Sequence, residues 1–316
     1  MNLRHMEYFC AIVDEGSISA AARQLRIAQP TLTLALRSLE RELGVDVLIR
    51  SSTGVTLTDA GLYYHGEAKR ILHAVSRAAE HMAAVSAGVA GRISLAVTPS
   101  YGWVYLPKVL RRLGAAAPDL QVTLHDPRPG EIINLVSAGA CDLGIIATSD
   151  LEVFRSRHAT EFCHTVVREL PLAAFVPSMW SRATEVVGFD EFRERPWVVP
   201  MSSPSFPGLA ALLERLWREH GWMPAALTEV STSQAVLPAV SGGLGVGLMP
   251  RSFAALAASS VVVQNLIEDI PPLKAVAIWR RDWPLSPAGQ LVLNLLGRDH
   301  DEPEASEEET SEQTPR

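Results

Sequence analysis

The sequence predicts a largely α/β protein in three parts: a mainly helical winged helix-turn-helix at residues 1–58, one long linker helix at 59–88, and a two-lobed α/β domain at 91–298. Three observations carry this prediction. Apolar residues at helical spacing fill the first part, a single heptad-like stripe runs along the second, and strands alternate with helices through the third. The 316 residues, 47% of them hydrophobic, are enough to bury more than one core.

Three short helices are expected in the first part. Apolar residues at helical spacing define an opening helix from Leu3 to near Gly16. Ser17 is placed to cap a second helix, Ile18–Leu25, through its side-chain oxygen. Small residues in that second helix would let it approach its neighbours closely: Ala20, Ala21 and Ala22.

A third helix is expected at Gln29–Leu43, after a turn at residues 26–28. Gly44 ends it, because glycine readily adopts the left-handed conformation of a helix C-cap. Leucines recur along this helix at spacings of 4, 3 and 4, and so should form one buried stripe: Leu32, Leu36, Leu39 and Leu43. Two short strands, Val45–Val47 and Val55–Leu57, would then form a wing around a polar loop.

The exposed face of the third helix carries side chains that suit a DNA groove. A helix that follows a three-residue turn and is polar on its outer face is typical of a recognition helix in the major groove. Gln29 can pair with adenine, and Arg37 with guanine or phosphate. The residues expected to contact DNA are Ser17, Gln29, Pro30, Thr31, Thr33, Leu34 and Arg37 on the helices, with Arg50 and Thr53 on the wing.

A purely structural helical bundle is the alternative that the pattern alone leaves open. Residues 1–58 hold six arginines and six acids, so the domain lacks the net positive charge that favours DNA binding. The acids lie mostly away from the start of the third helix, at Asp14, Glu15, Glu40 and Glu42.

Six runs in the first part form an ordered set of motifs. They are Leu3–Phe9, Gly16–Leu25, Gln29–Thr33, Leu39–Val45, Leu48–Arg50 and Leu57–Gly61. This set resembles the LysR-type transcriptional regulators, and the resemblance extends over about residues 2–298. It implies a DNA-binding transcriptional regulator whose C-terminal domain has a periplasmic-binding-protein-like (type 2) fold and binds a small-molecule co-inducer between its lobes. It further implies tetramers that contact a longer site and bend the DNA.

Three positions depart from the pattern of that family. Ala28 stands where Ser is usual, Leu34 where a basic or polar residue is usual, and Ile49 where Phe is usual. Ala28 removes an N-cap worth about 1 kcal/mol, and Leu34 replaces a polar contact with an apolar one. These departures bear on the operator sequence more than on DNA binding itself.

The long helix begins at Thr58 and Asp59 and carries a coiled-coil seam. Apolar residues repeat at alternating spacings of 4 and 3: Tyr64, Ala68, Ile71, Val75, Ala78, Met82 and Val85. Pairing with a second subunit would cover this seam, and the two recognition helices would then read a pseudo-palindromic operator. The alternative is packing on its own chain. His65, His73 and His81 are expected to be solvated or interfacial rather than metal ligands.

Alternating strands and helices from Arg92 onward predict a largely parallel sheet. Lobe I is expected at about 91–160 and 268–298, lobe II at about 161–267, and a single helix at Tyr101–Leu113. In open α/β sheets, ligands bind at the carboxyl ends of strands, where helix N-termini present free N–H groups. The hydroxyl-rich turns at such ends, with their neighbouring aromatic side chains, form the expected effector site: Thr98, Ser100, Tyr101, Ser202, Ser203, Phe206 and Thr232.

Ordinary helix caps are the alternative for each of these hydroxyl residues. The effector is expected to be a polar or anionic metabolite whose identity the sequence does not give. The sequence contains no Gly-x-Ser-x-Gly, His-Glu-x-x-His, phosphate-binding loop or four-ligand Cys/His set, so no catalysis, cofactor or metal is expected.

A two-lobed fold alone would also fit a solute-binding protein or an enzyme. The chain starts without a recognisable signal peptide, and no apolar run reaches the length of a membrane span. A cytoplasmic protein is therefore expected, with no membrane association. Its expected partners are double-stranded DNA, further copies of itself in a dimer or tetramer, and the effector, with RNA polymerase as a further candidate.

Cysteine spacing and the C-terminal tail complete the sequence evidence. Cys10, Cys141 and Cys163 fit no disulfide framework, and inert thiols are expected in preference to a redox switch. Residues 299–316 hold eight acids against Arg316, which accounts for the whole net charge of −7. This composition predicts a disordered acidic tail, as a solubilising extension in preference to a regulatory one.

Overall fold

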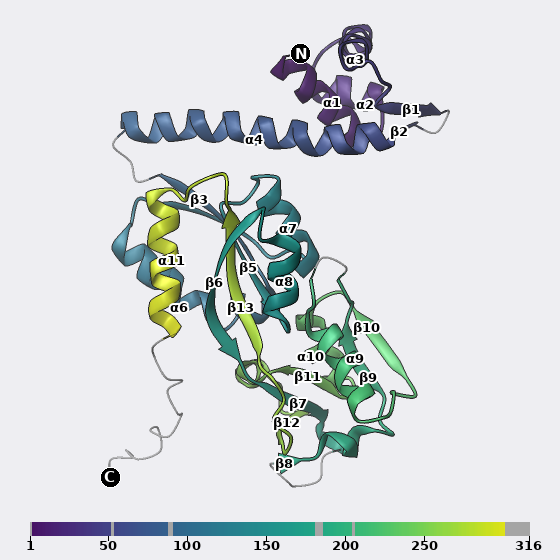
Figure 1. Ribbon diagram of the computed structural model, residues 1–316, viewed down its shortest axis with the longest axis vertical. Coiled ribbons are helices and arrows are strands. Elements are labelled where there is room, and N and C mark those ends of the chain that lie inside the picture. Colours follow the sequence, from purple (N-terminus) through teal and green to yellow (C-terminus); the bar gives the residue numbers. More distant parts are fainter. Residues whose placement is uncertain (1, 52–53, 88–90, 181–185, 204–205, 301–316) are drawn as a thin grey trace, which may run out of the picture.

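The computed structural model describes residues 2–51, 54–87, 91–180, 186–203 and 206–300. A small N-terminal domain lies at one end of the long helix α4, and a larger α/β domain lies along the other side of that helix (Figure 1). The first domain contains α1 (Leu3–Glu15), α2 (Ile18–Gln24), α3 (Gln29–Leu43), β1 (Leu48–Ser51) and β2 (Gly54–Leu57).

The three predicted N-terminal helices are confirmed, together with the residues that begin and end them. The Ser17 side chain accepts a hydrogen bond from the Ala20 N–H, and Gly16 and Gly44 adopt left-handed conformations that end α1 and α3. The apolar stripes of the helices meet in one core, with the α2 alanines inside it: Phe9, Ile12, Ala21, Leu32, Leu36 and Leu39 are all at most 2% exposed.

The first wing strand was predicted in the wrong place. The structure puts β1 at Leu48–Ser51, paired with β2 from Leu48↔Leu57 to Ser51↔Gly54, and not at Val45–Val47. The Val47 backbone is used elsewhere, because its N–H donates to the Glu40 side chain and its carbonyl accepts from the Thr58 N–H. Valines at 45 and 47 mimic a strand, whereas this segment connects α3 to the wing.

Helix α4 spans Asp59–Ala87, as the sequence predicts. Thr58 fixes its start: the Oγ1 atom accepts from the Gly61 N–H at 2.9 Å and donates to the Asp46 carbonyl at 2.9 Å. Both ends of the wing are thus tied to the first turn of α4.

The predicted seam of α4 divides into two parts. Tyr64 and Ala68 belong to the core of the N-terminal domain, where the Tyr64 ring lies 5.2 Å from that of Phe9 and Ala68 is fully buried. Ala68 therefore has no surface left for a second subunit and the prediction is wrong for this residue, whereas Tyr64 is half-buried. Farther along, Ile71 and Val75 are 39% and 45% exposed. Ala78 is also exposed; the side chains of Met82 and Val85 lie outside the described residues.

Lobe I is built on a five-stranded sheet of order β4-β3-β5-β13-β6. Strand β3 is parallel to β4 and β5, and β13 is antiparallel to β5 and β6. The strands are β3 (Arg92–Val97), β4 (Gln121–His125), β5 (Leu143–Thr148), β6 (Phe162–Leu170) and β13 (Leu273–Arg280). The helices are α5 (Pro99–Gly102), α6 (Leu106–Ala116), α7 (Pro129–Ser137), α8 (Leu151–His158) and α11 (Pro287–His300).

Three details of lobe I differ from the prediction. Strand β6 pairs with β13 along its length, so the chain leaves lobe I after Leu170 and not near residue 160. The single helix expected at Tyr101–Leu113 is two helices, and Pro107, which lacks an N–H, stands in the first turn of the second. Helix α11 continues to His300, two residues into the segment expected to be disordered; residues 301–316 lie outside the described part.

Lobe II holds a four-stranded sheet, β11-β7-β12-β8, and a parallel pair, β10-β9, which a bridge at Trp197↔Val246 connects. Its strands are β7 (Leu172–Pro177), β8 (Val186–Val187), β9 (Trp197–Pro200), β10 (Leu227–Val230), β11 (Gly247–Pro250) and β12 (Val261–Leu266). Its helices are η1 (Ser178–Trp180), η2 (Phe189–Phe192), α9 (Leu209–Glu219), α10 (Ser233–Ser241) and η3 (Arg251–Leu256).

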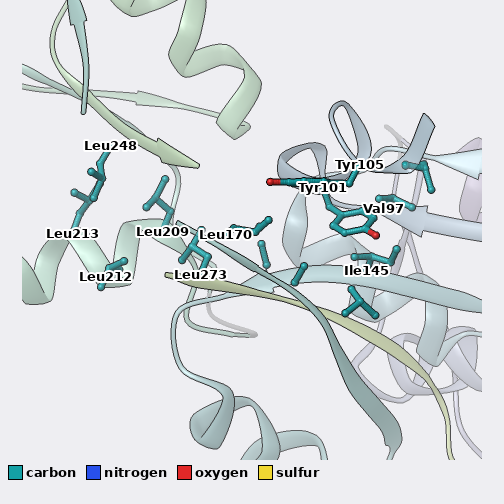
Figure 2. Close-up of a cluster of buried hydrophobic side chains, with 14 of the residues drawn as sticks. Val97, Tyr101, Tyr105, Ile145, Leu170, Leu209, Leu212, Leu213, Leu248 and Leu273 are labelled. Atoms are coloured by element: carbon teal, nitrogen blue, oxygen red, sulfur yellow. The ribbon is translucent and has the colours of Figure 1, made fainter. Parts of the chain in front are cut away.

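The two lobes share a continuous hydrophobic core. Figure 2 shows Tyr101 and Ile145 of lobe I on one side and Leu209, Leu213 and Leu248 of lobe II on the other. The crossing strands link the two sides through buried leucines: Leu170 and Leu273. One hydrophobic cluster therefore extends across both lobes, while each lobe also has a cluster of its own.

The side chain of Asp190 connects η2 to the end of α9. The Asp190 carboxylate accepts a hydrogen bond from Trp222 Nε1 at 2.7 Å and lies 2.8 Å from His220 Nδ1. These hydrogen bonds, first that of Trp222, lower the pKa of Asp190 from its usual value of 3.8. Because the folded-state pKa is the lower one, the stabilisation is present above the unfolded pKa and is lost as the pH falls through the folded one.

We expect Asp190→Asn to lower the melting temperature at pH 6 and to have a smaller effect at pH 3, because pH 3 lies below the usual pKa of 3.8 and part of the stabilisation is already lost there. Thermal unfolding followed by tryptophan fluorescence at the two pH values measures this difference. Asp269→Asn, at an exposed position, is the control and should have no effect at either pH. An equal loss at pH 6 and pH 3 for Asp190→Asn would contradict the prediction.

Candidate nucleic-acid interface and ligand cleft

The outward face of α3 carries polar side chains on a rigid base. Gln29, Pro30, Thr31 and Arg37 are exposed, and Thr33 is half-buried. The opposite face holds leucines that are at most 2% exposed: Leu32, Leu36 and Leu39. A side chain on such a helix is placed by the fold of the whole domain, as base recognition requires.

The start of α3 is held by α2. Ser19 Oγ donates to Gln29 Oε1 at 3.2 Å, and the Ile27 N–H donates to the Ala22 carbonyl at 3.0 Å across the turn. Arg26 has a φ of 55°, which is uncommon for a residue with a side chain. Ala28 makes no side-chain cap, as its lack of a hydroxyl predicts.

Arg23 and Arg26 are exposed beside this turn, and the sequence reasoning missed both. The sequence could have indicated them, because two positively charged residues stand just before the recognition helix, where phosphates approach in a helix-turn-helix complex. On the wing, the Arg50 side chain and all of Thr53 lie outside the described residues. Ser17 acts as the cap of α2, at the N-terminal end of that helix.

Leu34 is 65% exposed on the same outward face. An exposed leucine between polar neighbours provides a methyl-rich surface that suits a thymine methyl group better than a phosphate. The structure thus keeps Leu34 among the surface residues of the predicted interface.

In lobe I, Thr98, Ser100 and Tyr101 lie together at the end of β3. All three are at most 2% exposed, and the Thr98 and Ser100 hydroxyl oxygens are 3.2 Å apart. The Thr98 N–H donates to the Ile145 carbonyl, which joins this turn to the end of β5. The hydroxyls are not helix caps, since neither makes a side-chain cap hydrogen bond to α5.

In lobe II, α10 packs against α5 of lobe I. Thr232 precedes α10 and makes no side-chain cap hydrogen bond, and helices α10 and α5 are in contact. Gln234, in the first turn of α10, has its Nε2 atom buried without a hydrogen-bond partner among the described residues. A buried amide donor without a partner costs free energy that a ligand acceptor would recover.

Ser202 is not part of the group formed by Thr98, Ser100 and Tyr101. It lines a pocket of about 620 Å³ between α9 and the β9-β10 pair, together with Trp217, Arg218 and Met223. Neither Thr98 nor Ser100 lines that pocket. Ser203 is half-buried in the same loop.

Phe206, predicted as a wall of the effector site, is instead buried in lobe I. It is 1% exposed, and the other members of its hydrophobic cluster all come from lobe I. The sequence pattern could not reveal this, because it places Phe206 next to α9 in the chain but says nothing of which lobe its ring enters.

Two of the three cysteines, Cys10 and Cys141, are buried thiols. Burial raises the pKa of Cys10 to about 11, and burial also raises that of Cys141, so both thiols stay protonated near neutral pH. Within the same residues, no group of three or more His, Cys, Asp or Glu side chains could hold a metal ion. No helix there is long and apolar enough to cross a membrane.

Two protein-family signatures match the chain, one for each domain. The bacterial regulatory helix-turn-helix protein of the lysR family matches residues 3–62, and the LysR substrate binding domain matches residues 86–300. Together they cover most of the chain, including the recognition helix and both lobes.

Full-length relatives share about a quarter of their residues with the chain. The transcriptional regulator XapR of Escherichia coli is 28% identical over 85% of this chain and 89% of its own. The regulator ClcR of Pseudomonas putida is 28% identical over 94% and 98%, respectively.

The fold also matches solved structures along nearly its whole length. The LysR family regulator CbnR covers 96% of this chain and 100% of its own, with a TM-score of 0.75 and 22% identity. Full-length CbnR in complex with its target DNA gives a TM-score of 0.72 at 21% identity, covering 95% of this chain and 100% of that one. These matches extend over the predicted architecture from the helix-turn-helix through the second lobe.

Proposed function

The chain belongs to the LysR family of bacterial helix-turn-helix regulators, and we propose that it reads a pseudo-palindromic operator as a homodimer or homotetramer and responds to a polar effector held between its lobes. As a member of this family it is a DNA-binding transcriptional regulator with a C-terminal effector-binding domain, and not an enzyme. The proposal adds the residues, the assembly and the kind of effector.

The DNA-reading part of the proposal depends on one observation: the polar face of α3 is exposed while its leucine face is fully buried. Gln29, Thr31 and Arg37 would read bases, Thr33 and Leu34 would contact base edges or methyl groups, and Arg50 and Thr53 of the wing would contact the backbone. Support comes from the likeness of the fold to a regulator solved with its target DNA.

A mobility-shift titration tests DNA reading directly. The purified protein should retain a fragment from upstream of its own gene, or of a divergently transcribed neighbour, more tightly than random DNA of the same length. The logarithm of the affinity should fall linearly with the logarithm of salt, by about 0.9 for each phosphate contact. Equal affinity for both fragments at every salt concentration would refute sequence-specific reading.

The assembly would use the exposed part of the α4 seam: Ile71, Val75 and Ala78. We expect Val75→Glu to weaken self-association at least about tenfold, because a carboxylate buried at a helix pair without a partner is strongly destabilising. Sedimentation of the variant across a concentration series measures this. Ser76→Glu, at an exposed position of α4 that points away from the seam, is the matched control and should associate like the wild type. Equal association of both variants would place the interface elsewhere.

The effector would bind where the starts of α5 and α10 meet. Thr98, Ser100 and Thr232 offer hydroxyls there, the Gln234 amide offers a donor that lacks a partner, and Tyr101 supplies an apolar wall. Such a set favours a polar or anionic small molecule over a purely apolar one. Ser202 lines the separate pocket beside α9 and is left out of this proposed site, as is Ser203, which follows it in the same loop.

Thermal-shift screening of organic acids, amino acids and neutral aromatic compounds tests this effector class. A hit should stabilise the wild type and have a reduced effect on Ser100→Ala and Gln234→Leu. A hit among apolar compounds alone, unaffected by both substitutions, would reject the proposed site. We further propose that the regulator acts in the cytoplasm, where its DNA and RNA polymerase are found.

A further inference from the structure

A short segment of lobe II is embedded in lobe I. Phe206 follows β9 in the chain, yet the cluster that buries its ring is formed by side chains of β3, α7, β5, α8, β6 and β13. Ile133 of α7, Ile146 of β5 and Phe154 of α8 are among them. The ring is 1% exposed, so it lies inside lobe I rather than against its surface.

Backbone hydrogen bonds hold the next residue to the same lobe. The Pro207 carbonyl accepts from the Ser149 N–H at 2.9 Å and from Thr148 Oγ1 at 2.8 Å. Thr148 ends β5 and is fully buried, so this contact is shielded from water. The buried ring of Phe206 is thus followed directly by the Pro207 carbonyl, which accepts two hydrogen bonds from lobe I.

We infer that Phe206 and Pro207 form an interlobe latch, which holds lobe II against lobe I before any effector binds. In the described residues, the strands pass from one lobe to the other at Leu170–Leu172 and between β12 and β13. Two crossing strands allow the lobes to rotate about the line that joins them. The latch adds to the crossing strands and to the shared core, from a different part of lobe II, and rotation would have to pull the Phe206 ring out into water.

The consequence for regulation rests on the proposed function. An effector that turns one lobe against the other must either release this latch or act while it stays closed. The latch itself is a property of the effector-free domain, and it can therefore be tested without effector or DNA.

The test uses two spin labels in the full-length protein, one on each lobe. Arg111→Cys on α6 and Glu214→Cys on α9 provide exposed attachment sites, in a Cys163→Ser background because that native thiol is only half-buried. Phe206→Ala should shift the label-to-label distances to longer values and broaden them. The Ser149 amide, which donates to Pro207, should exchange with deuterium at least about tenfold faster.

Phe253→Ala is the matched control. Phe253 has the same 1% exposure, but its hydrophobic cluster lies wholly within lobe II. Both alanine variants should lower the melting temperature, by roughly 10 °C. Only Phe206→Ala should change the interlobe distances and the Ser149 exchange. If the two variants behave alike in both measurements, Phe206 is an ordinary core residue and the latch does not exist.

Thr148→Val keeps the test decisive should Phe206→Ala fail to fold. Valine preserves the shape of threonine but removes the Oγ1 donor to Pro207, so Ser149 exchange should still rise a few-fold, with a smaller loss of stability. Unchanged exchange in this variant would overturn the inference. Neither outcome depends on DNA recognition or on the effector, so failure of the latch leaves the proposed function standing.

Discussion

Gly61→Ala should destabilise the N-terminal domain by about 3 kcal/mol and remove DNA binding, although it adds a single methyl group. A β-carbon at position 61 would lie 1.9 Å from the Val47 carbonyl oxygen. That oxygen is fixed, because it accepts the Thr58 N–H that ties the wing to α4. The clash involves backbone rather than a flexible side chain, so the wing or the start of α4 would have to move.

Gly66→Ala is the matched control, five residues later on the same helix. A β-carbon there meets nothing within 4 Å, and alanine is the better helix former, so this variant should be stabilised by about 0.5–1 kcal/mol. Thermal unfolding of both variants, with a mobility shift at one salt concentration, measures the contrast. Should Gly61→Ala melt at or above the wild-type temperature, the close contact between wing and helix would not exist in solution.

Local signals in the sequence were sufficient to predict the N-terminal domain. The spacing of Leu32, Leu36 and Leu39 defines one buried stripe, and Gly16, Ser17 and Gly44 have backbone or capping roles that few other residues fill. These features act within a few residues along the chain. The helices could therefore be predicted to within about two residues, and their outward polar face followed from the stripe.

Contacts between distant segments were the features that the sequence could not supply. A heptad repeat indicates that Tyr64 and Ala68 are buried against another helix, but it does not say whether that helix belongs to a second subunit or is α1 of the same chain. Strand β6 was assigned to the wrong lobe because its pairing with β13 joins segments more than a hundred residues apart. Phe206 was misjudged for the same reason.

The candidate site was predictable to a similar extent. Thr98, Ser100 and Tyr101 could be proposed from the sequence because they follow a strand and open a helix, which is a local pattern. Gln234 could be proposed only from the structure, because its buried amide without a partner depends on packing between distant segments. Ser202 has the same local pattern as Ser100 but faces a different pocket.

Arg37→Ala should weaken binding to the preferred operator by about 10- to 100-fold, corresponding to roughly 1–3 kcal/mol for one base contact, and weaken binding to random DNA far less. Arg37 is exposed on the outward face of α3 and forms no ion pair or hydrogen bond within the described residues. Its removal should therefore leave the stability of the domain unchanged. Affinities for both DNAs at one fixed salt concentration measure the difference.

Arg41→Ala separates reading of bases from attraction of phosphates. Arg41 is also exposed on α3 and lies one turn farther than Arg37 from the N-terminal end, which is the end of a recognition helix that reaches base edges. We expect Arg41→Ala to weaken operator and random DNA alike, and to reduce the salt slope by about one phosphate contact. Arg37→Ala should keep that slope and lose the preference. Because both changes delete the same charge, a reversed result would mean that α3 enters the groove in a different orientation, with its C-terminal half toward the bases.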